Sequence, residues 1–123
     1  MGKHVLLIED EPNIAEALRF ILMRDGFRVS CHAQGEDAFE TICQEVPDAL
    51  ILDAMLPGRS GYEVLRELRA TPQTQHLPVL MLTARSQSRD RELAQEAGAS
   101  HFMTKPFSNA EVLASVRSLL GLG

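Results

Sequence analysis

Four of the five short apolar runs in this sequence end on side chains that can bind or accept a phosphoryl group. The endings are Glu9 and Asp10 after LLI, Asp53 after LIL, Thr83 in VLMLT and Lys105 after HFMT. The fifth run, RVSCH, has no such ending. If the runs are parallel strands, their carboxyl ends share one edge of a sheet, so these side chains converge. A phosphoryl acceptor that works with a divalent cation needs this set of groups.

Segments with the spacing of a helix face separate these runs along the chain. The strand-like runs cover 4–9, 28–33, 49–53, 78–83 and 100–104, and apolar residues three and four positions apart follow each of them. Runs such as ALIL and VLML have few polar interruptions, which is typical of parallel strands buried on both faces. We therefore predict an α/β fold with a doubly wound, five-stranded parallel sheet. Residues 1–123 would form a single domain, with 121–123 as a fraying end or the start of a linker.

Proline, glycine and serine residues mark the expected ends of helices. Pro12 fits the first turn of the first helix, and Gly26 fits the position just past its end. Pro47 is expected to end the second helix. Ser108 and Glu111 have the spacing of a capping box at the start of the last helix, which is the best-marked boundary in the chain.

The acids Glu9, Asp10 and Asp53 are candidate metal ligands. Neighbouring carboxylates repel one another unless a cation or a proton lies between them. Oxygen ligands at an open edge of a sheet suit a hard ion that keeps several waters, and we predict Mg²⁺. The simpler alternative is that these acids merely lead from buried strands into solvent, and for Glu9 a role through water, or none, stays open.

Asp53 is the candidate nucleophile, because a carboxylate held beside a cation can attack a phosphoryl donor and form an aspartyl phosphate. The Thr83 hydroxyl could donate to a phosphoryl oxygen, and Lys105 could supply a positive charge. Each of these two is weak evidence by itself. Lys105 precedes Pro106, which restricts the lysine backbone and makes the bond between them a candidate for the cis form.

Composition excludes several classes of function. The chain has 123 residues and a net charge of -5, and its arginines are interspersed among acids without forming a basic stripe. Direct binding to nucleic acid is therefore not expected. The apolar stretch after Met1 is too short, and is interrupted by acids too soon, for a signal sequence or a membrane span. We expect a cytoplasmic protein that does not bind membranes.

Neither the cysteines nor the histidines have the spacing of a metal site. Cys31 and Cys43 show no CxxC or other ligand pattern, and we expect two buried or half-buried thiols. The four histidines are dispersed along the chain. They are expected to be surface or packing residues and not zinc ligands.

Five motifs together identify a family. They are LLIEDEP at 6–12, LILDAMLPGRSG at 50–61, MLTA at 81–84, GAS at 98–100 and FMTKPF at 102–107. In this order and at this spacing, they resemble the receiver domain of bacterial two-component response regulators, and the resemblance covers the whole chain. It implies a flavodoxin-like (βα)5 sheet with the strand order 2-1-3-4-5.

The resemblance also implies a role for each acid. Asp53 would receive a phosphoryl group from a histidine kinase or a histidine phosphotransfer protein. Mg²⁺ would be held by Asp10, Asp53 and the main-chain carbonyl of Met55, with Glu9 assisting, often through water. The chain would catalyse only its own phosphorylation and dephosphorylation.

A conformational switch is implied in the same way. Thr83 and Lys105 would bind the phosphoryl oxygens, and Phe102 would turn inward as Thr83 moves toward the phosphate. The phosphoryl group would thereby favour one of two packings, which a downstream effector protein or domain recognises. Met55 and Arg85 stand at the positions that flank the phosphoryl group in the family and modulate autodephosphorylation.

Three residues depart from the winged-helix regulators, which dimerise through their fourth helix, fifth strand and fifth helix. Ser100 and His101 replace a usual pair of aspartates, and Ser115 stands where a pairing arginine is common. These departures argue against that dimer for this chain.

Two other functions stay open at this point. A magnesium-dependent phosphohydrolase of the aspartyl-phosphate kind would need a second aspartate two residues after the nucleophile, where this chain has Met55. A receiver-like binding module without phosphoryl turnover would not need the complete set of acids, threonine and lysine.

Overall fold

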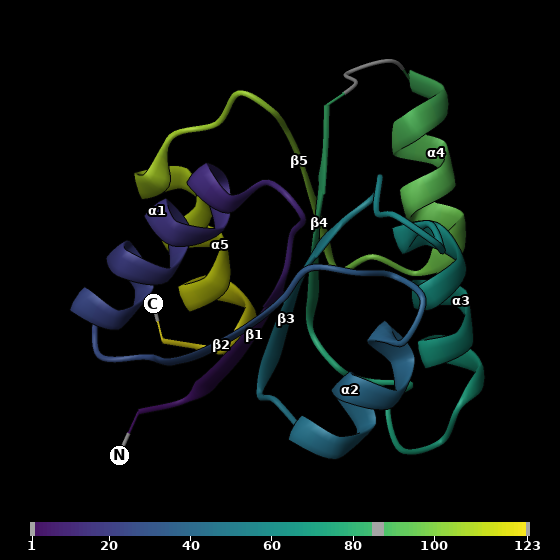
Figure 1. The fold of residues 1–123 in the computed structure, drawn as a ribbon, viewed down its shortest axis with the longest axis horizontal. Coiled ribbons are helices and arrows are strands. Elements are labelled where there is room, and N and C mark those ends of the chain that lie inside the picture. The colour runs from purple at the N-terminus through teal and green to yellow at the C-terminus, as the bar shows by residue number, and fades with distance from the viewer. Residues whose placement is uncertain (1, 85–87, 123) are drawn as a thin grey trace.

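The computed structural model describes residues 2–84 and 88–122, and strands and helices alternate along it as predicted (Figure 1). The elements are β1 (His4–Ile8), α1 (Pro12–Arg24), β2 (Arg28–His32), α2 (Ala38–Glu45), β3 (Ala49–Asp53), α3 (Gly61–Ala70), β4 (Val79–Thr83), α4 (Ser88–Ala97), β5 (His101–Thr104) and α5 (Asn109–Leu119).

All strands pair in parallel in the order β2-β1-β3-β4-β5, which confirms the predicted sheet. Helices α1 and α5 cover one face, and α2, α3 and α4 cover the other (Figure 1). Strand β2, which does not end on a side chain that can bind or accept a phosphoryl group, lies at the border of the sheet. The acid-bearing strands β1 and β3 are direct neighbours near the centre.

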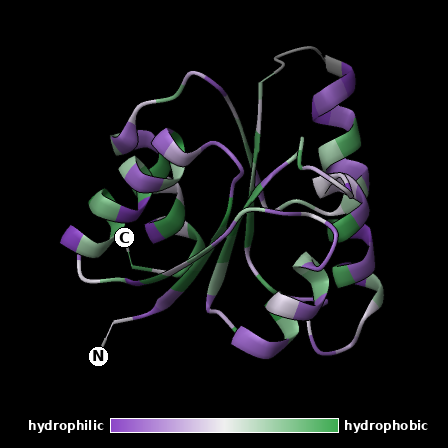
Figure 2. Ribbon diagram, in the orientation of Figure 1, coloured by the Kyte–Doolittle hydropathy of each residue, from purple (hydrophilic) through white to green (hydrophobic). Residues whose placement is uncertain are grey.

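The two covered faces of the sheet explain why the central strands β1, β3 and β4 are apolar at nearly every position and fully buried. Along β3, Leu50 and Leu52 pack on the side of α2 and α3, whereas Ile51 packs on the side of α1 and α5. Hydrophobic colour predominates in the central strands, and the helices show many polar residues (Figure 2). The sheet is therefore held from both sides, and its strand ends are fixed in place for the groups that follow them.

The predicted helix boundaries are present in the structure. Pro12 opens α1, and Gly26 follows that helix with a φ of +96°. Ser108 and Glu111 form the complete capping box of α5. The Lys105–Pro106 peptide bond is cis. Among the described residues, the structure has no helix long and apolar enough to cross a bilayer.

Two residues differ from what the pattern suggests. Cys31 is exposed, whereas Cys43 is half-buried, because Cys31 lies on the border strand β2, which has a neighbour on one side only. The residue that ends α2 before Pro47 is Val46, whose φ of 49° lies in the left-handed region that a β-branched residue rarely adopts.

Candidate functional site

The three acids meet at the edge of the sheet formed by the carboxyl ends of the strands. Ile8 of β1 pairs with Leu52 of β3, so the residues that follow them, Glu9 and Asp53, lie side by side. Carboxylate oxygens of Glu9, Asp10 and Asp53 all lie within 4.8 Å of one another. Glu9 and Asp53 are buried and Asp10 is exposed, so the cluster opens to solvent on the side of Asp10.

Lys105 brings a positive charge to this cluster from the far side of the sheet. Its Nζ donates a hydrogen bond to Asp53 Oδ2 at 2.9 Å and lies 3.0 Å from Glu9 Oε1. Because β5 is separated from β3 by β4, the lysine side chain reaches across the end of β4. The Lys105 N–H donates to the Thr83 carbonyl at 2.6 Å, which fixes the start of that reach.

Burial and crowding change the acidity of two of these groups. Burial is the main cause that raises the pKa of Glu9 from 4.5 to about 7, and the neighbouring Asp53 adds to the shift. Burial alone would lower the pKa of Lys105, but its contacts with Asp53 and Glu9 outweigh this and raise it. Lys105 therefore stays charged, while Glu9 holds a proton more readily than an ordinary glutamate.

The loop after β3 closes tightly around Asp53. Met55 N–H donates to Asp53 Oδ1 at 3.0 Å, which orients the carboxylate. A Cβ at Gly61 would lie 2.2 Å from the Asp53 carbonyl oxygen, so only glycine fits where the chain enters α3. Met55 itself is 56% exposed.

Thr83 and Phe102 lie on the strands beyond Asp53. Asp53 pairs with Leu82, so the buried Thr83 stands one residue further toward the edge of the sheet. Phe102 is half-buried, packs against the core on the side of α4, and has the Arg91 guanidinium 5.9 Å from its ring centre. Arg85, the other predicted flanking residue, lies outside the described residues.

Glu11 is a member of the site that sequence reasoning missed. Its Oε1 lies 3.4 Å from Lys105 Nζ, and its N–H donates to Glu9 Oε2 at 3.1 Å. The signal that could have found it is its place directly after Glu9 and Asp10 and one residue before α1.

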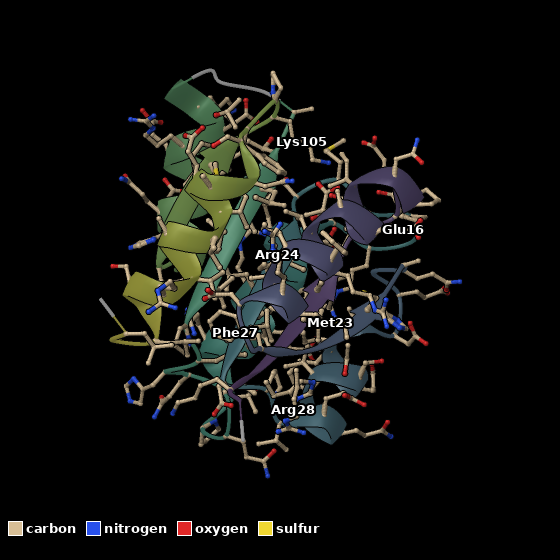
Figure 3. All side chains as sticks on the ribbon, turned by 90° about the vertical axis from the view of Figure 1, so that its left-hand side faces the viewer. Glu16, Met23, Arg24, Phe27, Arg28 and Lys105 are labelled. Carbon is tan, nitrogen blue, oxygen red and sulfur yellow. The ribbon has the colours of Figure 1, made fainter. Side chains whose placement is uncertain are left out.

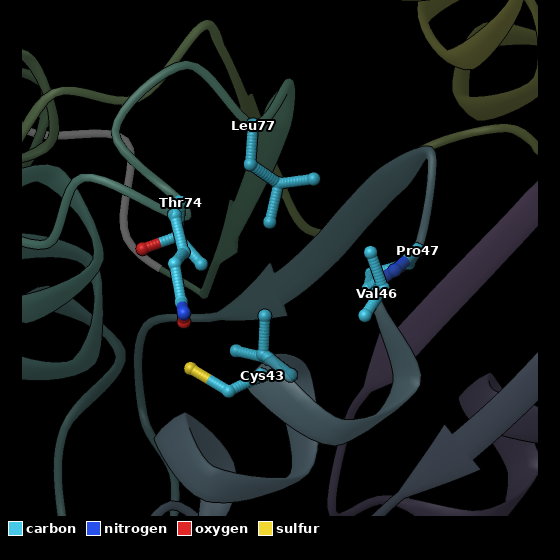
Figure 4. Close-up of a pocket in the computed structure, with 7 residues that line it drawn as sticks. Cys43, Val46, Pro47, Thr74 and Leu77 are labelled. Atoms are coloured by element: carbon cyan, nitrogen blue, oxygen red, sulfur yellow. The ribbon is translucent and has the colours of Figure 1, made fainter.

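Two hollows lie at opposite ends of the sheet. One, of about 250 Å³, runs beside Lys105 between α1 and the loop before α5, and Ile14, Ala17 and Phe107 are among its lining residues. The other, also of about 250 Å³, lies between the end of α2 and the loop before β4, with Cys43 and Thr74 in its wall (Figure 4). Within the part of the chain that the structure describes, no carboxylate lines this second pocket, so it offers nothing to the chemistry of the acids.

Comparison with known proteins agrees with this geometry. The family model described as the response regulator receiver domain matches residues 5–117. A putative response regulator from Chloroflexus aurantiacus is 36% identical, with a TM-score of 0.93 over 98% of this chain and 99% of that chain.

Two receiver domains of histidine kinases are also similar. That of a signal transduction histidine kinase from Syntrophus aciditrophicus is 32% identical, with a TM-score of 0.90 over 98% of this chain and 91% of that chain. That of a sensor histidine kinase from Pseudomonas aeruginosa, solved with a magnesium ion in its active-site cleft, is 33% identical, with a TM-score of 0.86 over 98% of this chain and 99% of that chain. The chain therefore belongs to the response regulator receiver domain family.

Proposed function

We propose that this receiver domain is a phospho-accepting signalling switch in which Asp53 takes a phosphoryl group from a histidine kinase or a histidine phosphotransfer protein. The observation that carries the proposal is the placement of Asp53, a buried carboxylate with Lys105 at 2.9 Å and two further acids within 4.8 Å. Such a group has a counter-charge ready for an incoming phosphoryl oxygen. The chain would catalyse only its own phosphorylation and dephosphorylation.

The acids fit a Mg²⁺ ion. Glu9, Asp10 and Asp53 offer three carboxylates within 4.8 Å of one another, which are hard oxygen ligands, and the charge of Lys105, 2.9 Å from Asp53 and 3.0 Å from Glu9, offsets only part of their negative charge. Asp10, Asp53 and the main-chain carbonyl of Met55 would hold the ion, with Glu9 assisting. Bound there, Mg²⁺ would offset the negative charge of the transferring oxygens.

The chain's own residues carry the transfer step. A carboxylate oxygen of Asp53 forms the new P–O bond while the P–N bond of the donor phosphohistidine breaks. The electron pair of that bond stays on the imidazole nitrogen, which then takes up a proton. Lys105 neutralises charge on the phosphoryl oxygens, and Thr83 donates its hydroxyl to one of them.

The switch would run from Asp53 to the surface formed by α4 and β5. Thr83 is buried at the end of β4, and Phe102 is half-buried on the neighbouring strand β5. If Thr83 moves toward the phosphoryl group, the volume it leaves can be filled by Phe102 turning inward. A downstream effector protein or domain would recognise the packing that results.

The hollow beside Lys105 supports a protein donor. It lies next to the site, and Ile14, Ala17 and Phe107 give it apolar walls. In Figure 3, which faces α1, Lys105 lies at the upper end of the molecule. A donor protein seated on this surface would present its phosphohistidine to Asp53 from the open side.

We also propose that this chain does not use the winged-helix dimer. Ser100 Oγ accepts a hydrogen bond from the Val79 N–H at 3.0 Å, and Ser115 Oγ lies 2.6 Å from His101 Nδ1. The two serine side chains thus make contacts within the chain, at positions where the winged-helix dimer would need charged residues that pair between subunits.

Phosphorylation with a small donor tests the proposed function. Incubation with acetyl phosphate and Mg²⁺ should add the mass of one phosphoryl group, measured on the intact protein. Asp53→Asn should gain none, and Asp48→Asn, an exposed acid at the other end of the sheet, should gain as much as the wild type. A wild type without added mass, or an Asp53→Asn variant that gains as much, would contradict the proposal.

A further inference from the structure

We propose that Glu11 restrains Lys105 in the unphosphorylated protein and thereby slows the uptake of a phosphoryl group by Asp53. The inference rests on the proposed function and adds a positioning residue to it. Glu11 is not among the residues expected to bind metal or phosphate.

The single positive charge of Lys105 lies close to three carboxylates. Its Nζ lies 2.9 Å from Asp53, 3.0 Å from Glu9 and 3.4 Å from Glu11. The side chains of Asp53 and Glu9 are 3% and 0% exposed, whereas that of Glu11 is 60% exposed. Glu11 is therefore the one of these three partners that can leave the lysine without disturbing the core.

The backbone holds Glu11 at the site and leaves its side chain available. Glu11 is the N-cap residue of α1, but its side chain makes no capping hydrogen bond. Its N–H instead donates to Glu9 Oε2, which ties the start of the helix to the acid cluster. The carboxylate can thus reach across the opening to Lys105, a residue 94 positions away in the sequence.

Phosphorylation changes what Lys105 must bind. A lysine ammonium has three N–H donors, and a phosphoryl group on Asp53 presents new anionic oxygens that compete for them. Contact with Glu11 holds one donor toward the opening and leaves fewer for the incoming group. The negative charge of Glu11 also lies on the side from which an anionic donor arrives. Both effects oppose phosphoryl uptake and disappear when Glu11 loses its charge.

Three variants separate the contact from the charge. Glu11→Gln removes the charge of the side chain while keeping its size. Glu11→Asp keeps the charge, but the shorter chain cannot span the distance to Lys105, and aspartate is a good N-cap residue that would turn toward the helix. Glu36→Gln is the matched control, because Glu36 is an exposed acid of the loop after β2, near the same edge, with no ion pair within the part of the chain described.

The rate of phosphorylation by acetyl phosphate at saturating Mg²⁺, followed by intact mass, is the first measurement. Exposed ion pairs have small energies, so Glu11→Gln should react about two- to fivefold faster than the wild type. Glu11→Asp should also react faster, and Glu36→Gln should match the wild type. The inference is wrong if Glu11→Gln keeps the wild-type rate, if Glu11→Asp keeps it, or if Glu36→Gln accelerates the reaction equally.

A second measurement tests the contact without any phosphoryl donor. In urea unfolding, Glu11→Gln should shift the folding equilibrium constant about two- to fivefold when Lys105 is present, and the shift should vanish in a Lys105→Met background. Equal shifts in both backgrounds would overturn the inference. A wild type that shows this coupling but takes up no phosphoryl group would contradict the proposed function and leave the Glu11–Lys105 contact established.

Discussion

The two edges of the sheet place their charged groups in opposite ways. At the edge where the strands begin, which we call the amino edge, Arg69 donates to the carbonyls of Gly98, Thr74 and Gln75 and to Ser100 Oγ. At the edge where the strands end, the carboxyl edge, Glu9, Glu11 and Asp53 all lie within 3.4 Å of the single ammonium of Lys105. At the amino edge the guanidinium of Arg69 is satisfied by hydrogen bonds to neutral groups, whereas the carboxyl edge leaves an excess of negative charge that an added cation would relieve. Removing a contact at the amino edge should therefore lower stability and leave activity unchanged, whereas relieving the excess of negative charge at the carboxyl edge should raise stability.

The largest expected effect on stability is at Arg69. Arg69→Met would leave several loop carbonyls without a donor, and we expect a loss of about 2 to 3 kcal/mol in the free energy of unfolding. Urea denaturation measures this loss. The folded variant should still take up a phosphoryl group at the wild-type rate.

Arg66→Met is the matched control for this prediction. Arg66 lies on the same helix and is exposed, so its replacement should change stability by less than about 0.5 kcal/mol. Equal losses in the two variants would show that the amino edge does not depend on the Arg69 contacts.

The next effect concerns Glu9 and the pH. Its pKa is raised from 4.5 to about 7, so protonation of Glu9 stabilises the folded protein fully below pH 4.5, and this contribution is lost as the pH rises toward about 7. Without Mg²⁺, Glu9→Gln should lack this loss and should be about 1 to 3 kcal/mol more stable than the wild type at pH 8.

Chemical denaturation across this pH range, with a chelator present, gives the comparison. Glu92→Gln removes an exposed acid of α4 and should follow the wild-type curve. If the free energy of unfolding of the wild type and of Glu9→Gln changes in parallel from pH 4.5 to 8, the excess of negative charge at the carboxyl edge does not destabilise the folded protein.

Addition of Mg²⁺ should stabilise the folded protein, and this gain should depend only on the acids of the carboxyl edge. At ten times its dissociation constant, a ligand of the folded state adds about 1.4 kcal/mol. For a chain of this length, that corresponds to a rise of about 4 to 7 °C in Tm. Asp10→Asn should reduce the rise, whereas Asp48→Asn, which changes the acid that accepts the His4 N–H at the amino edge, should keep it. Thermal unfolding with and without Mg²⁺ measures the rise in Tm. If the rise in Asp10→Asn equals that of the wild type, Asp10 is not a ligand of the ion.

The smallest effect is expected at Val46, also on the amino edge. Its left-handed φ of 49° is unfavourable for a β-branched residue, and its side chain is 75% exposed. Val46→Asn should stabilise the protein by about 0.5 to 1 kcal/mol, because asparagine tolerates this conformation. Thermal unfolding measures the gain, and Gln44→Asn, an exposed site within α2, should give none. A loss of stability in Val46→Asn would mean that Val46 makes a packing contribution larger than its strain.

Much of this arrangement follows from the sequence. Parallel strands place their ends at one edge, and the strand order implied by the family resemblance makes β1 and β3 neighbours, which brings Glu9, Asp10 and Asp53 together. The apolar runs and the helix-face spacing likewise predicted the doubly wound sheet. These features depend on local periodicity and on one rule of topology, which a single sequence displays.

What could not be predicted depends on the reach of long side chains. Arg69 binds loop carbonyls, and carbonyl positions leave no trace in the residue pattern. Glu11 meets Lys105 through two flexible side chains that are distant in sequence. The exposure of Cys31 follows from the border position of β2, which its own residues do not show. The burial of Glu9 depended on how its side chain turns after β1, and that choice was open before the fold was known.

The reach of Lys105 across the end of β4 ties the chemistry of this protein to the completeness of its folding. The acids come from β1 and β3 and the ammonium from the far border of the sheet, so β4 and β5 must both dock before the site has its positive charge. Bringing together residues so distant along the chain costs loop-closure entropy, which makes such contacts slow to form. A partly folded chain would have the acids but no ammonium to receive the phosphoryl oxygens. Under the proposed function, competence to accept a phosphoryl group would thus also be a check that the last strand is in place.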